Sequence, residues 1–251
     1  MSSNESTGER TASSEVPQEL EGQSAQSLRN TASDPGLTED LALRLLKRPG
    51  LGPEDLEALS KNANLGKLRK VRRALVEHPK TPRHVSLPML RHLYTFDLMQ
   101  VALTPVVPAD IKRAAEEALL TRLETISLGE KLSLAHRASG RIAEELLLEK
   151  EPRVMHAALE NPRLSESSIV KAVVRHDARI NLVEAICQHA KWPLRREVRV
   201  ALLRNEKTPL AKALEFARSL PPAVLREILQ NSRLPASTKT YLFKELKHPA
   251  H

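Results

Sequence analysis

The single cysteine of the chain, Cys187, stands two residues before His189, and a thiol beside an imidazole is the pairing that a cysteine nucleophile needs. Residues two apart on a helix point to different faces, so the two side chains are not expected to share an active site. One cysteine also excludes an internal disulfide and a cysteine-rich metal site. Cys187 is therefore predicted to be a small buried residue. The chain is predicted to be a non-enzyme without catalytic residues, metal or cofactor.

The nine histidines raise the question of a metal site. His84 and His92 are too far apart for one pair of helical ligands, and the zinc motif H-E-x-x-H is absent. His78 and His189 instead occupy a turn position that repeats along the chain. Three asparagines hold the same position, Asn161, Asn205 and Asn231. We expect both histidines to cap helix C-termini, where side-chain donors meet free carbonyl groups.

Basic residues give the strongest chemical signal. The segment KLRKVRR (67–73) is highly basic, and LRREVR (194–199) is its counterpart later in the chain. Arginines three apart share one face of a helix. A candidate interaction surface is predicted from eight residues, Lys67, Arg69, Lys70, Arg72, Arg73, Arg195, Arg196 and Arg199. Such a surface attracts acidic proteins or nucleic acid, although basic side chains also simply solvate an outer face and cover apolar surface with their stems.

These basic segments belong to a series of short amphipathic helices. Apolar residues recur three and four positions apart, as in Val71, Ala74 and Leu75, and no stretch alternates for long with period two. Five prolines are predicted to stand in the first turn of a helix, Pro82, Pro108, Pro193, Pro209 and Pro235. Thr81 and Thr208 precede two of these prolines and are predicted to be N-caps. The pattern predicts an all-α fold.

The chain also resembles itself when its first part is aligned with its last part. The phrase VRRALVEHPKTP (71–82) is matched by VRVALLRNEKTP (198–209). Without a gap, residues 34–119 align with residues 161–246, and roughly a quarter of the pairs are identical. The identities cover caps, turns and buried stripes together, whereas chance would match scattered leucines. We interpret the pattern as an internal duplication.

Each copy contains shorter units that end one helix, turn and begin the next. Such units cannot bury an apolar face alone, but stacked units share a continuous core and form a solenoid. The phrases at 71–82 and 198–209 resemble the V-R-x-A-L-A-x-N-P-x-T-P phrase of leucine-rich repeat variant proteins, which are bacterial helical solenoids related in shape to HEAT and armadillo arrays. Because the spacing of the units varies here, the resemblance implies an irregular HEAT-like α-solenoid. One member type of that family carries an iron–sulfur cluster in a cysteine-rich region, which this sequence lacks.

Composition changes near residue 34. Residues 1–33 are rich in Ser, Glu, Gln and Thr and are acidic, so a disordered tail is predicted there. Residues 34–251 are predicted to form the solenoid, with copy one at 34–119, a helical connector at 120–160 and copy two at 161–246. No secretory leader and no apolar run of membrane-spanning length occurs. The cysteine usage is typical of a cytoplasmic protein.

The net charge of +8 is concentrated in the body, because the tail is acidic. In a regular stack, equivalent basic residues of successive repeats would come into register as stripes along one surface. The leading hypothesis is a scaffold that binds another protein, with an acidic surface, through an extended helical surface. The alternative is duplex nucleic-acid binding through the basic stripes, because backbone recognition needs charge and shape and not aromatic stacking.

The nucleic-acid hypothesis has its own resemblance. Such a chain would be similar to the HEAT-like alkylpurine DNA glycosylases, which use a basic concave surface. Those proteins also place an aspartate with aromatic residues in the groove. The candidate aspartates here are Asp97, Asp110 and Asp177, and the sequence offers no aromatic set that matches the pattern.

Overall fold

The computed structural model describes residues 25–247, which are helical throughout, without a strand in that range. The helices are α1 (Ala25–Ser33), α2 (Glu39–Leu46), α3 (Pro53–Lys61), α4 (Arg69–Glu77), α5 (Arg83–Leu90), α6 (Thr95–Leu103), α7 (Ala109–Arg122), α8 (Leu128–Arg137), α9 (Gly140–Leu146), α10 (Pro152–Leu159), α11 (Glu166–Val174), α12 (Ile180–Gln188), the 3-10 helix η2 (Trp192–Leu194), α13 (Arg196–Arg204), α14 (Leu210–Arg218), α15 (Pro222–Gln230) and α16 (Ala236–Lys247). The predicted all-α class is confirmed for this range. None of these helices combines the length and apolarity that crossing a bilayer requires.

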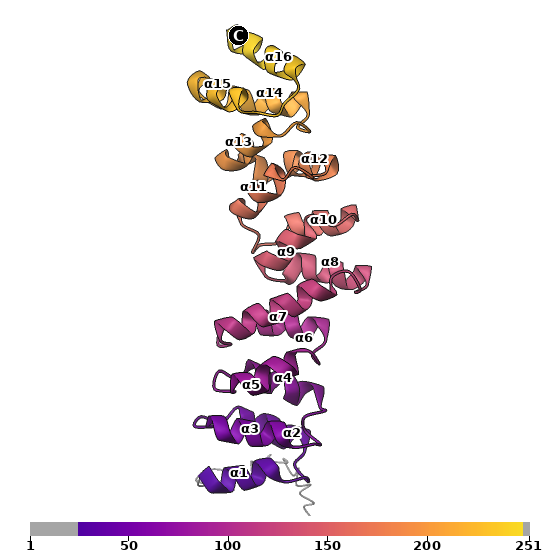
Figure 1. The fold of residues 1–251 in the computed structure, drawn as a ribbon, viewed down its shortest axis with the longest axis vertical. Helices are drawn as coiled ribbons and strands as arrows, with labels where there is room; N and C mark the ends of the chain where they lie inside the picture. Colours follow the sequence, from indigo (N-terminus) through magenta and orange to yellow (C-terminus); the bar gives the residue numbers. More distant parts are fainter. Residues whose placement is uncertain (1–24, 248–251) are drawn as a thin grey trace, which may run out of the picture.

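The helices stack in two rows along one long axis (Figure 1). Odd-numbered helices pack in one row, as α7 does against α9 and α9 against α11. Even-numbered helices pack in the other row, as α8 does against α10 and α10 against α12. Chain order follows the axis from α1 at one end to α16 at the other (Figure 1). Each helix therefore buries its apolar stripe mainly against helices that are near it in the sequence.

Seven consecutive helices recur when residues 34–119 are aligned with residues 161–246 and the same offset is continued toward the N-terminus. The bounds of α3, α4 and α6 align with those of α12, α13 and α15, and the first residues of α1, α2, α5 and α7 align with those of α10, α11, α14 and α16. Only α8 and α9 lie between the two series. The predicted connector, 120–160, thus also contains α10, which matches α1. Residues before the aligned range had too few identities to reveal this pairing.

The turns after α4 and α13 differ from the prediction in one respect. Thr81 Oγ1 donates to the Leu75 carbonyl and Thr208 Oγ1 donates to the Leu202 carbonyl, each at 2.6 Å. Both threonines are buried and close the preceding helix. The N-cap position of the next helix belongs to the proline, which offers no side-chain oxygen. The predicted threonine N-caps are therefore wrong, because the hydroxyl satisfies one of the free carbonyls that every helix leaves at its C-terminus.

The predicted boundary of the N-terminal tail also needs correction. Helix α1 begins at Ala25, inside the segment predicted to be disordered, and Ala32 is buried. The side chain of Asn62, at the end of α3, donates to the Ala32 and Asp34 carbonyls at 3.2 and 2.9 Å. A short polar helix is stabilised in this way by the neighbour it packs on, which composition alone does not reveal. The remainder of the predicted tail, residues 1–24, lies outside the described residues.

The buried apolar side chains fall into two clusters. The smaller runs from Ala32 to Leu75, through α1 to α4, and the larger runs from Val76 to Leu242. Leu75 and Val76 are adjacent on α4, so this helix presents one side to each cluster. Met89 packs against both clusters. The stack therefore has a discontinuity in its core at α4 and α5.

Candidate functional site

The eight basic residues predicted to form one surface lie in two separate places. Lys67, Arg69, Lys70, Arg72 and Arg73 belong to α4 and the turn before it, whereas Arg195, Arg196 and Arg199 belong to α13 and its N-cap. Helices α4 and α13 stand in opposite rows of the stack (Figure 1). Helices with aligned bounds, such as α4 and α13, are nine places apart in chain order. Because odd-numbered and even-numbered helices occupy different rows, an odd separation puts the two helices of such a pair in different rows. Register between repeats therefore does not align these residues in one stripe.

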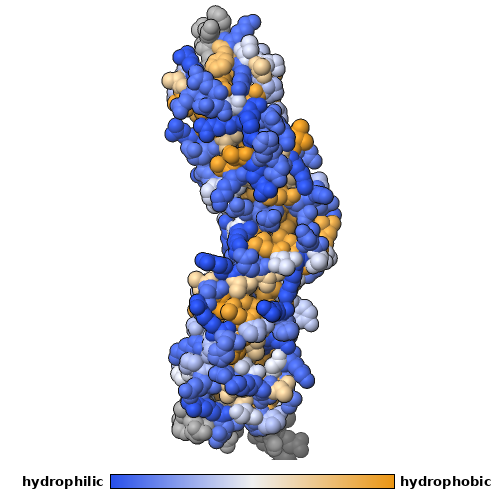
Figure 2. Space-filling model, viewed as in Figure 1, coloured by the Kyte–Doolittle hydropathy of each residue, from blue (hydrophilic) through white to orange (hydrophobic). Residues whose placement is uncertain are grey.

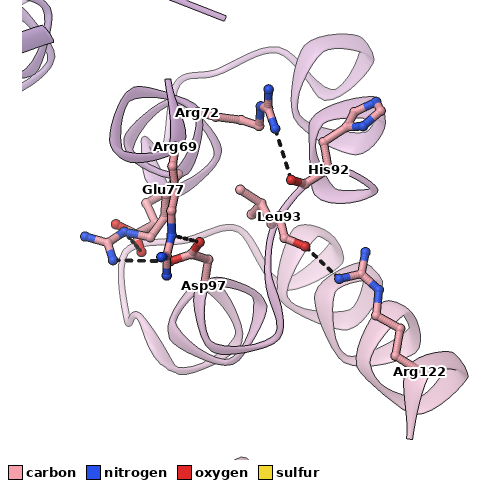
Figure 3. A network of polar contacts seen from close by, with 8 residues as sticks. Arg69, Arg72, Glu77, His92, Leu93, Asp97 and Arg122 are labelled. Atoms are coloured by element: carbon pink, nitrogen blue, oxygen red, sulfur yellow. Dashed lines mark hydrogen bonds and ion pairs between the residues drawn. The ribbon is translucent and has the colours of Figure 1, made fainter. Parts of the chain in front are cut away.

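Two matching pairs of basic residues serve the fold itself, by binding oxygens at helix ends. Arg72 donates to the Gly66 carbonyl at 2.8 and 3.1 Å and to the His92 carbonyl at 3.0 Å (Figure 3). Its counterpart Arg199 donates to Ser219 Oγ at 2.6 Å. Lys112 and Lys239, also a matching pair, each reach a carbonyl seven residues earlier. These cations satisfy carbonyl and hydroxyl oxygens at turns, where helices leave acceptors free.

Five of the predicted residues are exposed, and four of these are not held by Asp97: Lys67, Lys70, Arg195 and Arg196. Among the residues whose side chains the structure describes, 29–244, the side chains of these four form no hydrogen bond or ion pair. Their charge is available to a partner at two sites, one in each row of the stack.

Asp97, in the first turn of α6, organises the basic residues of α4. Its carboxylate is almost completely buried, with 2% of the residue exposed. Arg69 donates Nε to Oδ2 at 2.7 Å and Nη2 to Oδ1 at 3.2 Å (Figure 3). Arg73 Nη1 lies 3.5 Å from Oδ1. This bidentate pair fixes the Arg69 guanidinium in one plane, a geometry that arginine and carboxylate favour, and the carboxylate raises the pKa of Arg69.

Glu77 completes the ionic cluster at the end of α4. Its carboxylate lies 3.6 Å from Arg73 Nε, one helical turn away, and is partly buried. Burial raises the pKa of Glu77, the Arg73 cation opposes that rise, and the nearby Asp97 carboxylate adds to it. Two carboxylates therefore share two arginines where α4 meets α6 (Figure 3).

Two exposed aromatic residues stand at the start of α6, the helix that carries Asp97. Tyr94 is 63% exposed and Phe96 is 38% exposed, at the beginning of α6. The Arg69 guanidinium carbon lies 4.9 Å from the centre of the Tyr94 ring, within the range of a cation–π contact. We call Arg69, Tyr94 and Phe96 the Tyr94 patch. Its arginine is held from beneath by buried Asp97, so the patch is preorganised.

A second helix start adjoins the Tyr94 patch. The Thr95 side chain hydrogen-bonds the Glu130 carboxylate, which also accepts from the Ser127 backbone at 3.1 Å and from its hydroxyl at 2.9 Å. The hydrogen bonds from Ser127, with that from Thr95, lower the pKa of Glu130. This capping box begins α8, whose first residue, Leu128, is exposed. The contact of Thr95 with Glu130 therefore links the start of α6 to the start of α8.

The second series of helices provides an internal control for this cluster. At the aligned positions of that series, Tyr94 is matched by Pro221, Phe96 by Ala223 and Asp97 by Val224. Arg73 and Glu77 are matched by Val200 and Arg204, although Arg69 is matched by Arg196. Helices α13 and α15 pack together as α4 and α6 do, and have the corresponding bounds. Packing of this kind therefore does not require the ionic cluster or the aromatic pair.

The histidines and the cysteine lie where the sequence predicted. His78 and His189 are the C-caps of α4 and α12, and each accepts a backbone N–H from two residues later. His189 Nε2 also lies 3.2 Å from Glu160. Cys187 is 2% exposed, and burial raises its pKa to about 12, which is the behaviour of an inert thiol. Within residues 29–244, no group of three His, Cys, Asp or Glu side chains has metal-site geometry.

The three candidate aspartates are each paired with an arginine. Asp110 binds Arg83 at 2.7 Å, and Arg175 binds Asp177 at 2.9 Å, in addition to the buried Asp97 pair. Asp110 and Asp177, which are more exposed than Asp97, have lowered pKa values because of their arginine partners. From the sequence, Asp97 was considered only as a free carboxylate, and Tyr94 and Phe96 were not identified as candidates. A comparison of the two aligned segments, 34–119 and 161–246, for charged or aromatic residues present in one segment alone would have identified all three.

Comparison with known protein families, with curated proteins and with solved structures finds no match to this chain.

Proposed function

We propose that the chain is a non-enzymatic helical-repeat scaffold that binds another protein through the Tyr94 patch. The scaffold is an irregular α-solenoid built from two copies of a seven-helix unit, joined by α8 and α9. The recurrence of seven helix starts and of the Thr81 and Thr208 hydrogen bonds supports the duplication. The partner presents an acidic surface, because Lys67 and Lys70 lie near the patch in the sequence and are exposed.

The observation that carries this proposal is the presence of the Tyr94 patch in one copy only. Exposed Tyr, Phe and Arg side chains are the types enriched at protein interfaces and at their energetic centres. The two exposed aromatic side chains are not needed for the fold of their own copy, since the other copy folds with proline and alanine at the aligned positions. Buried Asp97 holds Arg69 in place before binding, which lowers the entropy lost on association.

The surface of the stack offers further apolar contact area near this site. Figure 2 shows hydrophobic residues gathered over the middle of the stack, around α7 to α10, between bands of hydrophilic residues. Apolar patches rimmed by polar residues are typical of protein-binding surfaces. Duplex nucleic acid is the less favoured partner, because the basic groups of α4 and α13 lie in opposite rows and Arg72 and Arg199 are engaged at turns.

The test is capture of partners from a native lysate by the tagged full-length chain, followed by mass spectrometry. Wild type is compared with Tyr94→Ala and with Tyr241→Ala, which removes another exposed tyrosine, on α16. The proposal predicts proteins that are retained by wild type and Tyr241→Ala and lost with Tyr94→Ala. Equal retention by all three chains refutes the Tyr94 patch as the binding surface. Circular dichroism confirms that each variant is folded.

A parallel titration with random-sequence duplex DNA addresses the alternative. Tight binding that weakens steeply with salt and is lost when Lys67, Lys70, Arg195 and Arg196 are changed to Gln would favour nucleic acid over protein. We expect weak binding at low salt that disappears near physiological ionic strength.

A further inference from the structure

Three turns of the second series lie together at one edge of the stack. Helices α11, α13 and α15 follow one another in the odd-numbered row, where α11 packs on α13 and α13 on α15 (Figure 1). The segments 174–180, 204–210 and 230–236 each run from the last residue of one of these helices to the first residue of the next helix. They contain five basic and two acidic residues. Positive charge therefore predominates along this edge.

Hydrogen bonds join the three turns to one another. Lys207 Nζ donates to the Ala178 carbonyl at 2.6 Å. The Arg233 backbone N–H donates to the Arg204 carbonyl at 3.0 Å, and Arg233 Nη2 donates to the Val174 carbonyl at 3.0 Å. The last turn thus contacts the ends of both preceding helices, and the three turns form one surface.

Two kinds of exposed side chain recur on this surface. One arginine lies in each turn, at positions 29 residues apart, and all three are exposed. Three aliphatic residues at helix ends of the same turns are about half exposed, two at 52% and one at 46%. We call these six residues the arginine edge: Val174, Arg175, Ile180, Arg204, Leu210 and Arg233.

Arg175 already binds a carboxylate at this edge. Its Nε donates to Asp177 Oδ1 at 2.9 Å and its Nη2 to Oδ2 at 3.0 Å. Both side chains are largely exposed, so the pair contributes little to stability and exchanges readily with a carboxylate from outside. The Arg204 side chain forms no hydrogen bond or ion pair within residues 29–244. The arginine edge is therefore available to acidic groups.

The first series of helices lacks this combination. Its aligned turns also contain more basic than acidic residues, so positive charge alone does not distinguish the two series. The residues aligned with Val174, Ile180, Arg204, Leu210 and Arg233 are Lys47, Pro53, Glu77, Arg83 and Val106. Turns of this kind therefore fold without the exposed aliphatic residues and without an arginine in each turn.

The spacing of the turns indicates the conformation of a partner. Neighbouring helices of one row are about 8–10 Å apart. A polyproline II helix has three residues per turn and rises about 3.1 Å per residue, so its side chains return to one face every ~9.3 Å. Acidic residues at every third position of such a segment would meet successive arginines. The residues between them would meet the aliphatic side chains, which a phosphate backbone has no apolar group to cover.

We infer that the arginine edge binds an acidic protein segment in the polyproline II conformation. A carboxylate at every third residue pairs with Arg175, Arg204 and Arg233, and intervening apolar side chains cover the three aliphatic residues. The inference goes beyond the proposed function, because the Tyr94 patch belongs to α4 and α6 and the arginine edge to the second series. A chain with both surfaces binds two partner segments.

The experiment is a titration of the full-length chain into a fluorescent peptide, followed by anisotropy at low ionic strength. The peptide consists of repeated Glu-Leu-Pro triplets and is about twelve residues long, enough to pass all three turns. A peptide of Gln-Leu-Pro triplets has the same length and conformation without charge. We expect the Glu peptide to bind at least about tenfold more tightly, because it forms three additional ion pairs.

Variants of the chain locate the binding site. Arg204→Gln combined with Arg233→Gln should weaken binding of the Glu peptide at least about fivefold. Arg113→Gln combined with Arg153→Gln removes the same charge from exposed positions on α7 and α10 and should change the affinity by less than about twofold. Circular dichroism confirms that each variant is folded.

A second pair of variants tests the apolar part of the edge without changing charge. Leu210→Gln should weaken binding at least about threefold, since the peptide no longer covers an aliphatic side chain. Leu194→Gln, in η2, is the matched control, because Leu194 is even more exposed, at 74%, and lies outside the three turns. Equal effects of the two substitutions would contradict apolar contact at the edge.

Three results would overturn the inference. Equal affinity for the Glu and Gln peptides removes the carboxylate contacts, and equal weakening by the two arginine pairs shows attraction by net charge alone. Random-sequence duplex DNA that binds more tightly than the Glu peptide, and loses that affinity with Arg204→Gln and Arg233→Gln, assigns the edge to nucleic acid. Capture of proteins that depends on Tyr94 is a separate readout, so the proposed function stands or falls independently of these results.

Discussion

Asp97 shows at the scale of single residues how one buried carboxylate can define a surface. The residue is 2% exposed and binds Arg69 in two places, while the Arg69 side chain itself remains more than half exposed. The carboxylate thus lies beneath the surface and the cation on it. A buried charge is tolerated only when it is paired and hydrogen-bonded, so Asp97 and its arginines depend on each other.

Substitution Asp97→Asn should destabilise the chain by about 1–3 kcal/mol, because the buried position loses its charge-assisted hydrogen bonds and leaves two arginines without their acceptor. Urea denaturation followed by circular dichroism measures the change. Asp110→Asn is the matched control, since its pair with exposed Arg83 lies at the surface and contributes little. Comparable losses from the two substitutions would contradict the structural role of Asp97.

Cys187 should be unreactive toward a thiol reagent in the folded chain. A pKa of about 12 instead of 9.0 lowers the thiolate fraction near pH 8 by about a thousandfold, and burial blocks access as well. The measurement is the rate of disulfide exchange with an aromatic disulfide reagent, in buffer and in guanidinium chloride. Fast stoichiometric reaction in buffer would show that the thiol is accessible.

At the scale of elements, the turns fix how closely successive helices approach. Asn161 donates to the Ala135 carbonyl at 2.7 Å, and Asn205 donates to the Val173 carbonyl at 2.7 Å. Each asparagine also accepts a backbone N–H from two residues later. One side chain therefore shapes its own turn and ties it to the end of the helix two places earlier in the same row.

Gly140 and Gly129 should respond in opposite directions to substitution by alanine. A Cβ at Gly140, the first residue of α9, would lie 2.5 Å from the Arg163 carbonyl oxygen, whereas a Cβ at Gly129 in α8 meets nothing within 4 Å. Gly140→Ala should cost about 1–3 kcal/mol through the displaced backbone. Gly129→Ala should gain about 0.5–1 kcal/mol, because alanine favours the helix. Thermal or urea denaturation decides, and a neutral Gly140→Ala would mean that α9 and the turn after α10 are not in close contact.

At the scale of the whole molecule, the stack depends on contacts between near neighbours. The extensive helix contacts within residues 25–247 join helices that are close in the sequence, so folding stability is distributed along the axis. The discontinuity in the core between Leu75 and Val76 then separates a small N-terminal part from the rest. Such a chain is not expected to unfold in one cooperative step.

Two probes should therefore give transitions that do not coincide. Trp192 belongs to the larger cluster, so its fluorescence reports that part alone, whereas far-ultraviolet circular dichroism reports every helix. We expect helix loss to begin at a lower urea concentration than the Trp192 transition. Leu56→Ala, in the smaller cluster, should advance the first step without moving the second, and Leu202→Ala should advance the second. Superimposable curves for both probes would show that the stack unfolds as one unit.

The helices and their turns were readable from the sequence because their signals are local. The apolar spacing of Val71, Ala74 and Leu75 and the prolines that open helices act within a few residues. His78 and His189 were predicted at helix C-termini and are found there, since a turn position is set by its immediate neighbours. The Thr81 and Thr208 hydroxyls were assigned to the wrong helix because a side chain between two helices has acceptors on both sides, and only packing selects one.

The placement of the basic groups and the Asp97 cluster was decided by the tertiary structure. Repetition in the sequence predicted equivalent residues in register, but the rows alternate, and an odd number of places between matching helices puts α4 and α13 on opposite sides. Arg69 and Asp97 are separated by a whole helix and a turn, so their pairing follows from the packing of α4 on α6. Sequence determines what one helix and its caps do, whereas contacts between helices depend on how many helices intervene and how they pack.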